Sequence, residues 1–129
     1  MLGRIHSVVI WTDDVRRLTP FYTEKLGLEA EMEGDDFVVF NNPQGGTQLA
    51  LGRHSKTHGP AREPDRIMVN FNVNDITRTY EKLSSAGVEF TRPPSPEMDG
   101  FTLATFRDPD GNTLQLFESP NSRGDRRYR

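Results

Sequence analysis

The 129-residue chain contains no cysteine. This absence excludes disulfide bonds, thiolate metal sites and thiol nucleophiles, so a metal ion would need His, carboxylate or amide ligands. The chain also lacks an apolar run of about 18 residues, the length of a membrane-spanning helix, and its N-terminus lacks the pattern of a secretory signal. We therefore expect a cytoplasmic protein with no membrane partner.

Apolar residues are scarce, at 33% of the chain, which together with the length predicts one domain with a modest core. The net charge is −3. Residues 119–129 carry four Arg and one Asp, so residues 1–118 are more acidic than the whole chain. An acidic body argues against a nucleic-acid partner. We expect the segment 119–129 to be a disordered tail, because it offers almost nothing to bury.

The sequence consists of two halves with a similar order of patterns. The segment RIHSVVIWTDD, residues 4–14, matches RIMVNFNVND, residues 66–75. Both are alternating strand patterns that end in Asp just before a helical pattern. Such a duplication predicts two copies of one small structural module.

A helical pattern follows each of these strands. In the first half, Asp13 or Asp14 is the expected N-cap and Gly27 the expected stop; in the second half, these are Asp75 and Gly87. The apolar faces comprise Val15, Leu18, Tyr22 and Leu26 in the first helix, and Ile76, Tyr80 and Leu83 in the second. Pro20 lies inside the first pattern and predicts a kink or a two-part helix there.

Three short strands are expected after each helix. They cover residues 28–33, 36–41 and 47–52 in the first half, and 88–92, 101–107 and 113–118 in the second. Turn sequences at 42–46 and 108–112 join the last two strands of each set as hairpins. The sequence thus predicts an α+β fold with a βαβββ module at 4–52, a linker at 53–65 and a second βαβββ module at 66–118.

Strand alternation separates the residues of each sheet into two faces. On the strand 67–73, Ile67, Val69, Phe71 and Val73 share one face, which we expect to pack against a helix. If helices cover only one face, the other collects a mixed set that is typical of a ligand-lined concavity. That set is His6, Gln48, Met68, Asn70, Asn72 and Gln115, with Trp11, Phe37, Phe101 and Phe117 as expected aromatic walls.

Several short motifs of this sequence resemble those of the vicinal oxygen chelate superfamily, which includes glyoxalase I, bleomycin- and fosfomycin-resistance proteins and extradiol dioxygenases. They are His6 at the start of the first strand, FYTEKLGL at 21–28, DPDGN at 108–112 and LQLFE at 114–118. The resemblance covers residues 4–118. It implies a strongly curved, partly open, mixed β-barrel-like sheet with helices on its outer face. It also implies a homodimer with clefts shared between modules or subunits.

In the metal-using members of this superfamily, the first and last strands of each module supply His and Glu ligands to a divalent ion. Carried over by position, the four sites fall on His6, Gln48, Met68 and Gln115. Neutral amides and a thioether are poor ligands for such ions, so we expect no tightly bound metal. Glu118 lies three residues beyond Gln115, and this odd offset places it on the opposite face of the sheet unless a bulge intervenes.

Each of these residues also has a structural interpretation. His6 is either a hydrogen-bonded histidine at a strand start or a ligand contact and general acid or base. Gln48 and Gln115 are either ligand contacts or a structural pair bonded to each other, and Met68 suits cavity-wall packing. His54 and His58 have a helical spacing, but Gly59-Pro60 follows and the segment is loop-like, which argues against a zinc site.

Three functions fit the sequence. The first is a metal-free small-molecule-binding protein, like the antibiotic-resistance members that sequester a drug without turnover. The alternative is a metal-dependent lyase, isomerase or dioxygenase with a weakly bound divalent metal on an altered set such as His6, Gln48 and Gln115, or a metal-free enzyme with His6 as acid or base. The third is a structural or regulatory dimer that has no small-molecule role.

Overall fold

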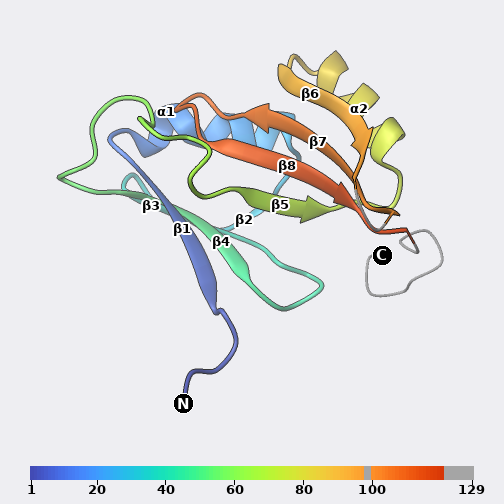
Figure 1. Cartoon of the computed structure of the whole chain (residues 1–129). Coiled ribbons are helices and arrows are strands. Elements are labelled where there is room, and N and C mark those ends of the chain that lie inside the picture. Colours follow the sequence, from blue (N-terminus) through green and yellow to red (C-terminus); the bar gives the residue numbers. More distant parts are fainter. Residues whose placement is uncertain (98–99, 121–129) are drawn as a thin grey trace. The chain divides into compact units, whose positions relative to one another are not determined.

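The computed structural model describes residues 1–97 and 100–120 and divides the chain into two compact units, Met1–Gly59 and Pro60–Arg129 (Figure 1). The boundary between the units falls inside the segment 53–65, where the sequence predicts a linker. No helix among the described residues is long and apolar enough to cross a membrane.

The first unit is a βαβββ module. Its elements are β1 (Ser7–Thr12), α1 (Val15–Pro20), the π-helix η1 (Phe21–Lys25), β2 (Ala30–Glu33), β3 (Phe37–Phe40) and β4 (Gln48–Arg53). The sheet has the order β1-β4-β3-β2. Strand β1 runs parallel to β4, and the other neighbours are antiparallel.

The second unit repeats this order. Its elements are β5 (Val69–Asn72), α2 (Ile76–Ser85), β6 (Phe90–Pro96), β7 (Thr102–Arg107) and β8 (Thr113–Glu118), and its sheet has the order β5-β8-β7-β6. The predicted α+β class and the duplicated βαβββ order are confirmed. The strands form two four-stranded mixed sheets, one in each unit.

Matching caps begin the two helices that follow β1 and β5. The Asp14 carboxylate accepts a hydrogen bond from the Arg17 N–H at 3.2 Å, and the Asp75 carboxylate accepts one from the Arg78 N–H at 3.2 Å. These bonds satisfy backbone donors that have no partner inside the helix. The structure therefore selects Asp14 over Asp13 as the first N-cap.

The predicted break at Pro20 is confirmed. Helix α1 ends at Pro20, and the chain continues as the π-helix η1. Proline has no N–H to donate and its ring crowds the preceding turn, so regular α-helical bonding cannot continue through it. Gly27 then adopts a φ of 77°, which lets the chain leave the helix in a left-handed conformation.

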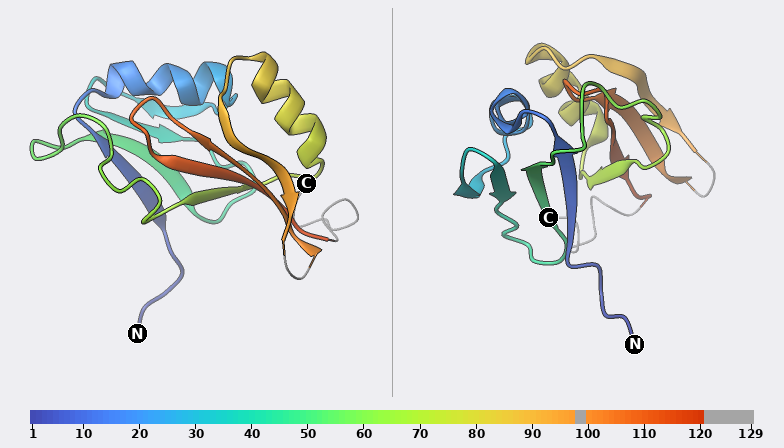
Figure 2. Two further views of the ribbon diagram at one scale, coloured as in Figure 1. Left: turned by 45° about the horizontal axis from the view of Figure 1, so that its top comes forward. Right: turned by 90° about the vertical axis from the view of Figure 1, so that its left-hand side faces the viewer.

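Each unit has its core between its helix and one face of its own sheet (Figure 2). Helix α1 packs on β3 and β4, and α2 packs on β6, β7 and β8. The predicted apolar helix faces supply much of this core, because Val15, Leu18, Tyr22, Ile76 and Leu83 are all buried. Within the described residues, the opposite face of each sheet carries no helix of the same unit.

One prediction at the start of a strand needs correction. Ile67 is 77% exposed rather than packed against a helix, because β5 begins only at Val69 and Ile67 precedes the sheet. The predicted tail, residues 119–129, stays a prediction, because residues 121–129 lie outside the described part of the chain.

Candidate functional site

The site begins with the face of the first sheet that α1 does not cover. Strand β1 pairs with β4 so that Ser7 lies beside Gln48, Val9 beside Ala50 and Trp11 beside Gly52. Neighbours in register point to the same side of a sheet. This helix-free face therefore has a polar end, near Gln48, and an aromatic end, near Trp11.

A hollow of about 300 Å³ lies at the polar end, and we call it the polar hollow. The Gln48 Nε2 atom donates to Glu31 Oε2 at 2.9 Å. The exposed side chain of His6 lines the same hollow, and the His6 carbonyl oxygen accepts from the Gln48 N–H at 3.0 Å. The complete lining is Arg4, His6, Glu31, Asn41, Asn42, Gly45, Gly46 and Gln48.

The structure thus brings together two residues that the sequence predicts, His6 and Gln48, with others that it does not predict, among them Arg4 and Glu31. Arg4 donates through Nη1 to the Gly46 carbonyl at 2.9 Å, and Glu31 accepts from Gln48. Glu31 belongs to the strand β2, on the far side of the sheet order from β1. No spacing in the sequence signals this contact, because it depends on how far one long side chain reaches across the sheet.

Three rings form an aromatic cluster at the other end of the same face: Trp11, Phe37 and His54. The Trp11 ring lies 5.4 Å from the His54 ring in an edge-to-face arrangement and 6.5 Å from the Phe37 ring. Gly52 makes room for the rings, because a Cβ atom built on it would lie 2.5 Å from Trp11 Cζ3 and 3.1 Å from Phe37 Cδ2. Trp11 nevertheless remains 45% exposed.

The helix-free face of the second sheet carries the other predicted residues. Asn70 lies beside Gln115 in register, and both Asn70 and Asn72 are exposed, so neither needs a protein partner. Met68 precedes β5 and is 42% exposed. The rings of Phe101 and Phe117 lie 4.8 Å apart, so they form an aromatic pair within this unit.

The two glutamines have different partners within their own units. Gln48 donates to Glu31, and Gln115 donates through Nε2 to Thr105 Oγ1 at 3.0 Å. The interpretation in which Gln48 and Gln115 bond to each other stays a prediction.

The helix caps and the strand registers show which residues of the two units occupy equivalent positions, and these differ from the predicted ones. Asp75 lies 61 residues after Asp14, so the same offset pairs Ser7 with Met68 and Val9 with Asn70. Ala50 lies beside Val9, just as Gln115 lies beside Asn70.

The matching positions are therefore Ser7, Ala50, Met68 and Gln115 rather than His6, Gln48, Met68 and Gln115. The prediction aligned His6 with Met68 while it left Asp13 and Asp14 both open as the first cap, and only Asp13 would agree with that alignment. A shift of one residue moves every side chain of a strand to the other face.

Neither pair of matching positions fits a divalent ion within its own unit. Ser7 and Ala50 offer a hydroxyl and a methyl group, and Met68 and Gln115 offer a thioether and an amide. Both pairs lack the imidazole and carboxylate groups that hold such ions in proteins. Across residues 1–97 and 100–120, no group of three or more His, Asp or Glu side chains is arranged to hold a metal.

Glu118 has a structural role on the opposite face, as its offset from Gln115 predicts. Its Oε2 accepts from the Ile76 N–H at 2.7 Å, which ties the end of β8 to the first turn of α2. We expect Glu118→Ala to lower the free energy of unfolding by about 1 kcal/mol, since it removes a helix-terminal acceptor. Urea unfolding followed by circular dichroism measures this. Glu89→Ala, at an exposed position of the same unit, is the control and should change little.

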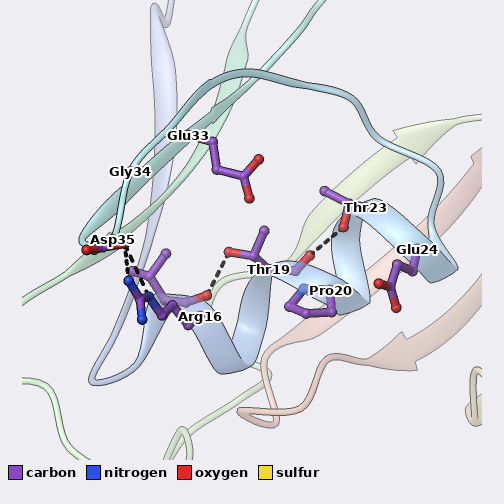
Figure 3. Close-up of a pocket in the computed structure, with 9 residues that line it drawn as sticks. Arg16, Thr19, Pro20, Thr23, Glu24, Glu33, Gly34 and Asp35 are labelled. Carbon is purple, nitrogen blue, oxygen red and sulfur yellow. Dashed lines mark hydrogen bonds and ion pairs between the residues drawn. The ribbon is translucent and has the colours of Figure 1, made fainter.

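A second hollow of about 300 Å³ lies on the helix side of the first unit (Figure 3). Thr19 and Thr23 line it, but their hydroxyls donate to the Val15 and Thr19 carbonyls. Arg16 is paired with Asp35, which raises the pKa of Arg16. None of the predicted ligand-binding residues lines this hollow.

Comparisons with known proteins agree with this architecture. The family model of the Glyoxalase/Bleomycin resistance protein/Dioxygenase superfamily matches residues 4–116. The chain is 29% identical to the uncharacterized protein YetH of Bacillus subtilis, over 92% of this chain and all of that one. It is 26% identical to a probable lactoylglutathione lyase of Vibrio parahaemolyticus, over 91% of each chain. A solved superfamily member from Sphaerobacter thermophilus is 29% identical with a TM-score of 0.72, over 92% of this chain and 98% of that chain.

Proposed function

Because the chain belongs to the Glyoxalase/Bleomycin resistance protein/Dioxygenase superfamily, we propose that it binds a small molecule on the helix-free faces of its sheets without the usual divalent ion. The observation that carries this proposal is the donor set at the four matching positions, Ser7, Ala50, Met68 and Gln115. Because none of these four side chains is negatively charged, a divalent ion would lack both strong ligand bonds and compensation of its charge.

The side chains on these faces suit an organic ligand. The polar hollow offers an imidazole, a guanidinium, an amide and a carboxylate, and the aromatic cluster offers exposed rings at the other end of the same face. Such a combination of apolar surface with a few polar groups is typical of ligand sites. The proposal extends to a homodimer, as the family resemblance implies, to a cytoplasmic location, and to sequestration of the ligand without turnover.

Elemental analysis tests the metal-free part. After purification with Ni, Co, Mn, Fe and Zn present, we expect less than about a tenth of an ion per chain, because tight binding needs a preformed set of anionic or imidazole ligands. The double variant Met68→His/Gln115→Glu is the positive control, since it introduces an imidazole and a carboxylate into one unit. Stoichiometric metal in the unaltered chain would contradict the proposal.

Thermal unfolding with a panel of dye-like and glycopeptide compounds tests the binding part. A compound present at 100 times its dissociation constant should stabilise the chain by about 2.7 kcal/mol. We expect at least one compound to shift the melting temperature. The absence of any shift at millimolar concentration across the panel would count against a binding function.

One observation favours a second function. His6 and Glu31 line one hollow with Gln48, so this part of the face offers an imidazole and a carboxylate that the four matching positions lack. The alternative is a lyase, isomerase or dioxygenase that holds a divalent ion weakly here or uses His6 as an acid or base. Metal uptake that is lost in both His6→Ala and Glu31→Gln would favour this alternative.

A further inference from the structure

The aromatic cluster has features that the proposed function does not by itself explain. Trp11 is the only tryptophan of the chain and is 45% exposed, although large aromatic side chains are usually well covered. Gly52, the residue beside Trp11 in register, has no side chain that could displace the indole ring. An uncovered indole that packs closely over a glycine is a surface on which a flat ring can stack.

His54 adds a directed hydrogen-bond donor to this surface. The Lys56 N–H donates to His54 Nδ1 at 3.1 Å, so this bond assigns the proton of the neutral ring to Nε2. The backbone N–H of His54 donates to the Thr12 carbonyl at 3.2 Å. This bond extends the β1–β4 pairing and keeps the imidazole beside Trp11. The Nε2–H group is thus a donor at the edge of the stacking surface.

The segment that carries His54 is basic. Residues 53–58, RHSKTH, contain an exposed Arg53 and Lys56 and no acidic residue. The Gly59 N–H donates to Asp13 at 2.8 Å, which anchors the end of this segment and lowers the pKa of Asp13. Asp13 also pairs with Arg17, which partly compensates its charge.

These surroundings decide which ligand fits the indole. An exposed tryptophan attracts either a cation or another flat ring. Lys56 lies next to the cluster, because its backbone N–H donates to His54 Nδ1. Arg53, in contrast, follows Gly52 on β4 and so points to the other face. The positive charge of Lys56 and the ring donor of His54 disfavour a cation and favour an anion. We propose, building on the proposed function, that the aromatic cluster binds the ring of a planar aromatic carboxylate, with the ring on Trp11 and the carboxylate on His54 Nε2–H.

The emission of Trp11 provides a test at the site itself, because no other tryptophan contributes to it. The probes are benzoate, cyclohexanecarboxylate and benzylammonium at constant ionic strength, with excitation near the red edge of indole absorption. We expect a saturable change with benzoate. Its affinity should be at least about fivefold higher than that of cyclohexanecarboxylate, which has the same charge but no flat ring, or of benzylammonium, which has the ring but the opposite charge.

Two variants keep the tryptophan and change its surroundings. Gly52→Ala places a methyl group where the Trp11 ring lies, and His54→Leu removes the donor; each should weaken benzoate binding about fivefold or more. His58→Gln is the matched control, because it alters a histidine of the same segment outside the cluster, and it should leave the affinity unchanged. Circular dichroism confirms that each variant is folded.

Other outcomes would overturn this inference and leave the proposed function standing. One is equal affinity for benzoate and cyclohexanecarboxylate. Another is binding that the thermal panel detects but that neither changes Trp11 emission nor responds to Gly52→Ala and His54→Leu. A third is Trp11 emission that changes with protein concentration but not with added benzoate, which would mean that a second copy of the chain covers the cluster. Failure of the whole thermal panel, in contrast, would overturn the proposed function itself.

Discussion

Replacing Phe106 with alanine is expected to lower the free energy of unfolding by about 3 to 5 kcal/mol, because it removes a fully buried ring and leaves a cavity. Phe106 is 0% exposed and lies in β7 beneath α2, with its ring 5.2 Å from that of Phe90. A loss of this size is a large part of the stability of a small domain. Urea unfolding monitored by circular dichroism measures it.

The control for this prediction is Phe101→Ala, which makes the same chemical change at a half-buried position of the same unit. Its ring contacts Phe117 on the helix-free face, outside the core between α2 and the sheet. We expect a clearly smaller loss there. Equal losses for the two variants would mean that the core of this unit does not lie where the structure places it.

The second large effect concerns the turn between β7 and β8. The Asp108 Oδ1 atom accepts from the Asp110 and Asn112 N–H groups, both at 2.9 Å, and Oδ2 accepts from Asn112 Nδ2 at 2.9 Å. Asp108 is 5% exposed, so water cannot easily replace it. We expect Asp108→Ala to cost about 3 kcal/mol, because three donors lose their acceptor in a largely buried turn.

Asp108→Asn refines this prediction. The amide keeps one carbonyl oxygen for the two backbone donors, but its NH₂ group would then face the Asn112 amide, another donor. An intermediate loss of stability is expected, again by urea unfolding. If Asp108→Ala were as stable as the unaltered chain, the hydrogen bonds of this turn would not be stabilising the hairpin.

The effect of Phe106→Ala and the proposed binding surface lie on opposite faces of the sheets. Leu51 and Phe106 are buried on the faces that the helices cover, whereas Trp11 and Asn72 are exposed on the helix-free faces. Exposed side chains such as these can change in chemistry at little cost to the core. A fold that uses a metal in some relatives can thereby present amides and rings in this one.

The sequence by itself determined the duplicated modules, the break at Pro20 and the two hairpin turns. These features follow from local rules: proline cannot donate a backbone hydrogen bond, and Asp, Asn and Gly favour tight turns. Alternation along the strand 67–73 likewise placed Asn70 and Asn72 on the face opposite Val69 and Phe71, and the exposure of the two asparagines agrees.

Only the tertiary structure decided which residues share the candidate site. The choice between Asp13 and Asp14 as the helix cap shifted the match between the halves by one residue, which exchanged His6 for Ser7 at the matching position. Glu31 meets Gln48, and His54 meets Trp11, through contacts between different strands and a loop. Such contacts depend on strand register and side-chain reach across the sheet, and neither leaves a periodic signal along the chain.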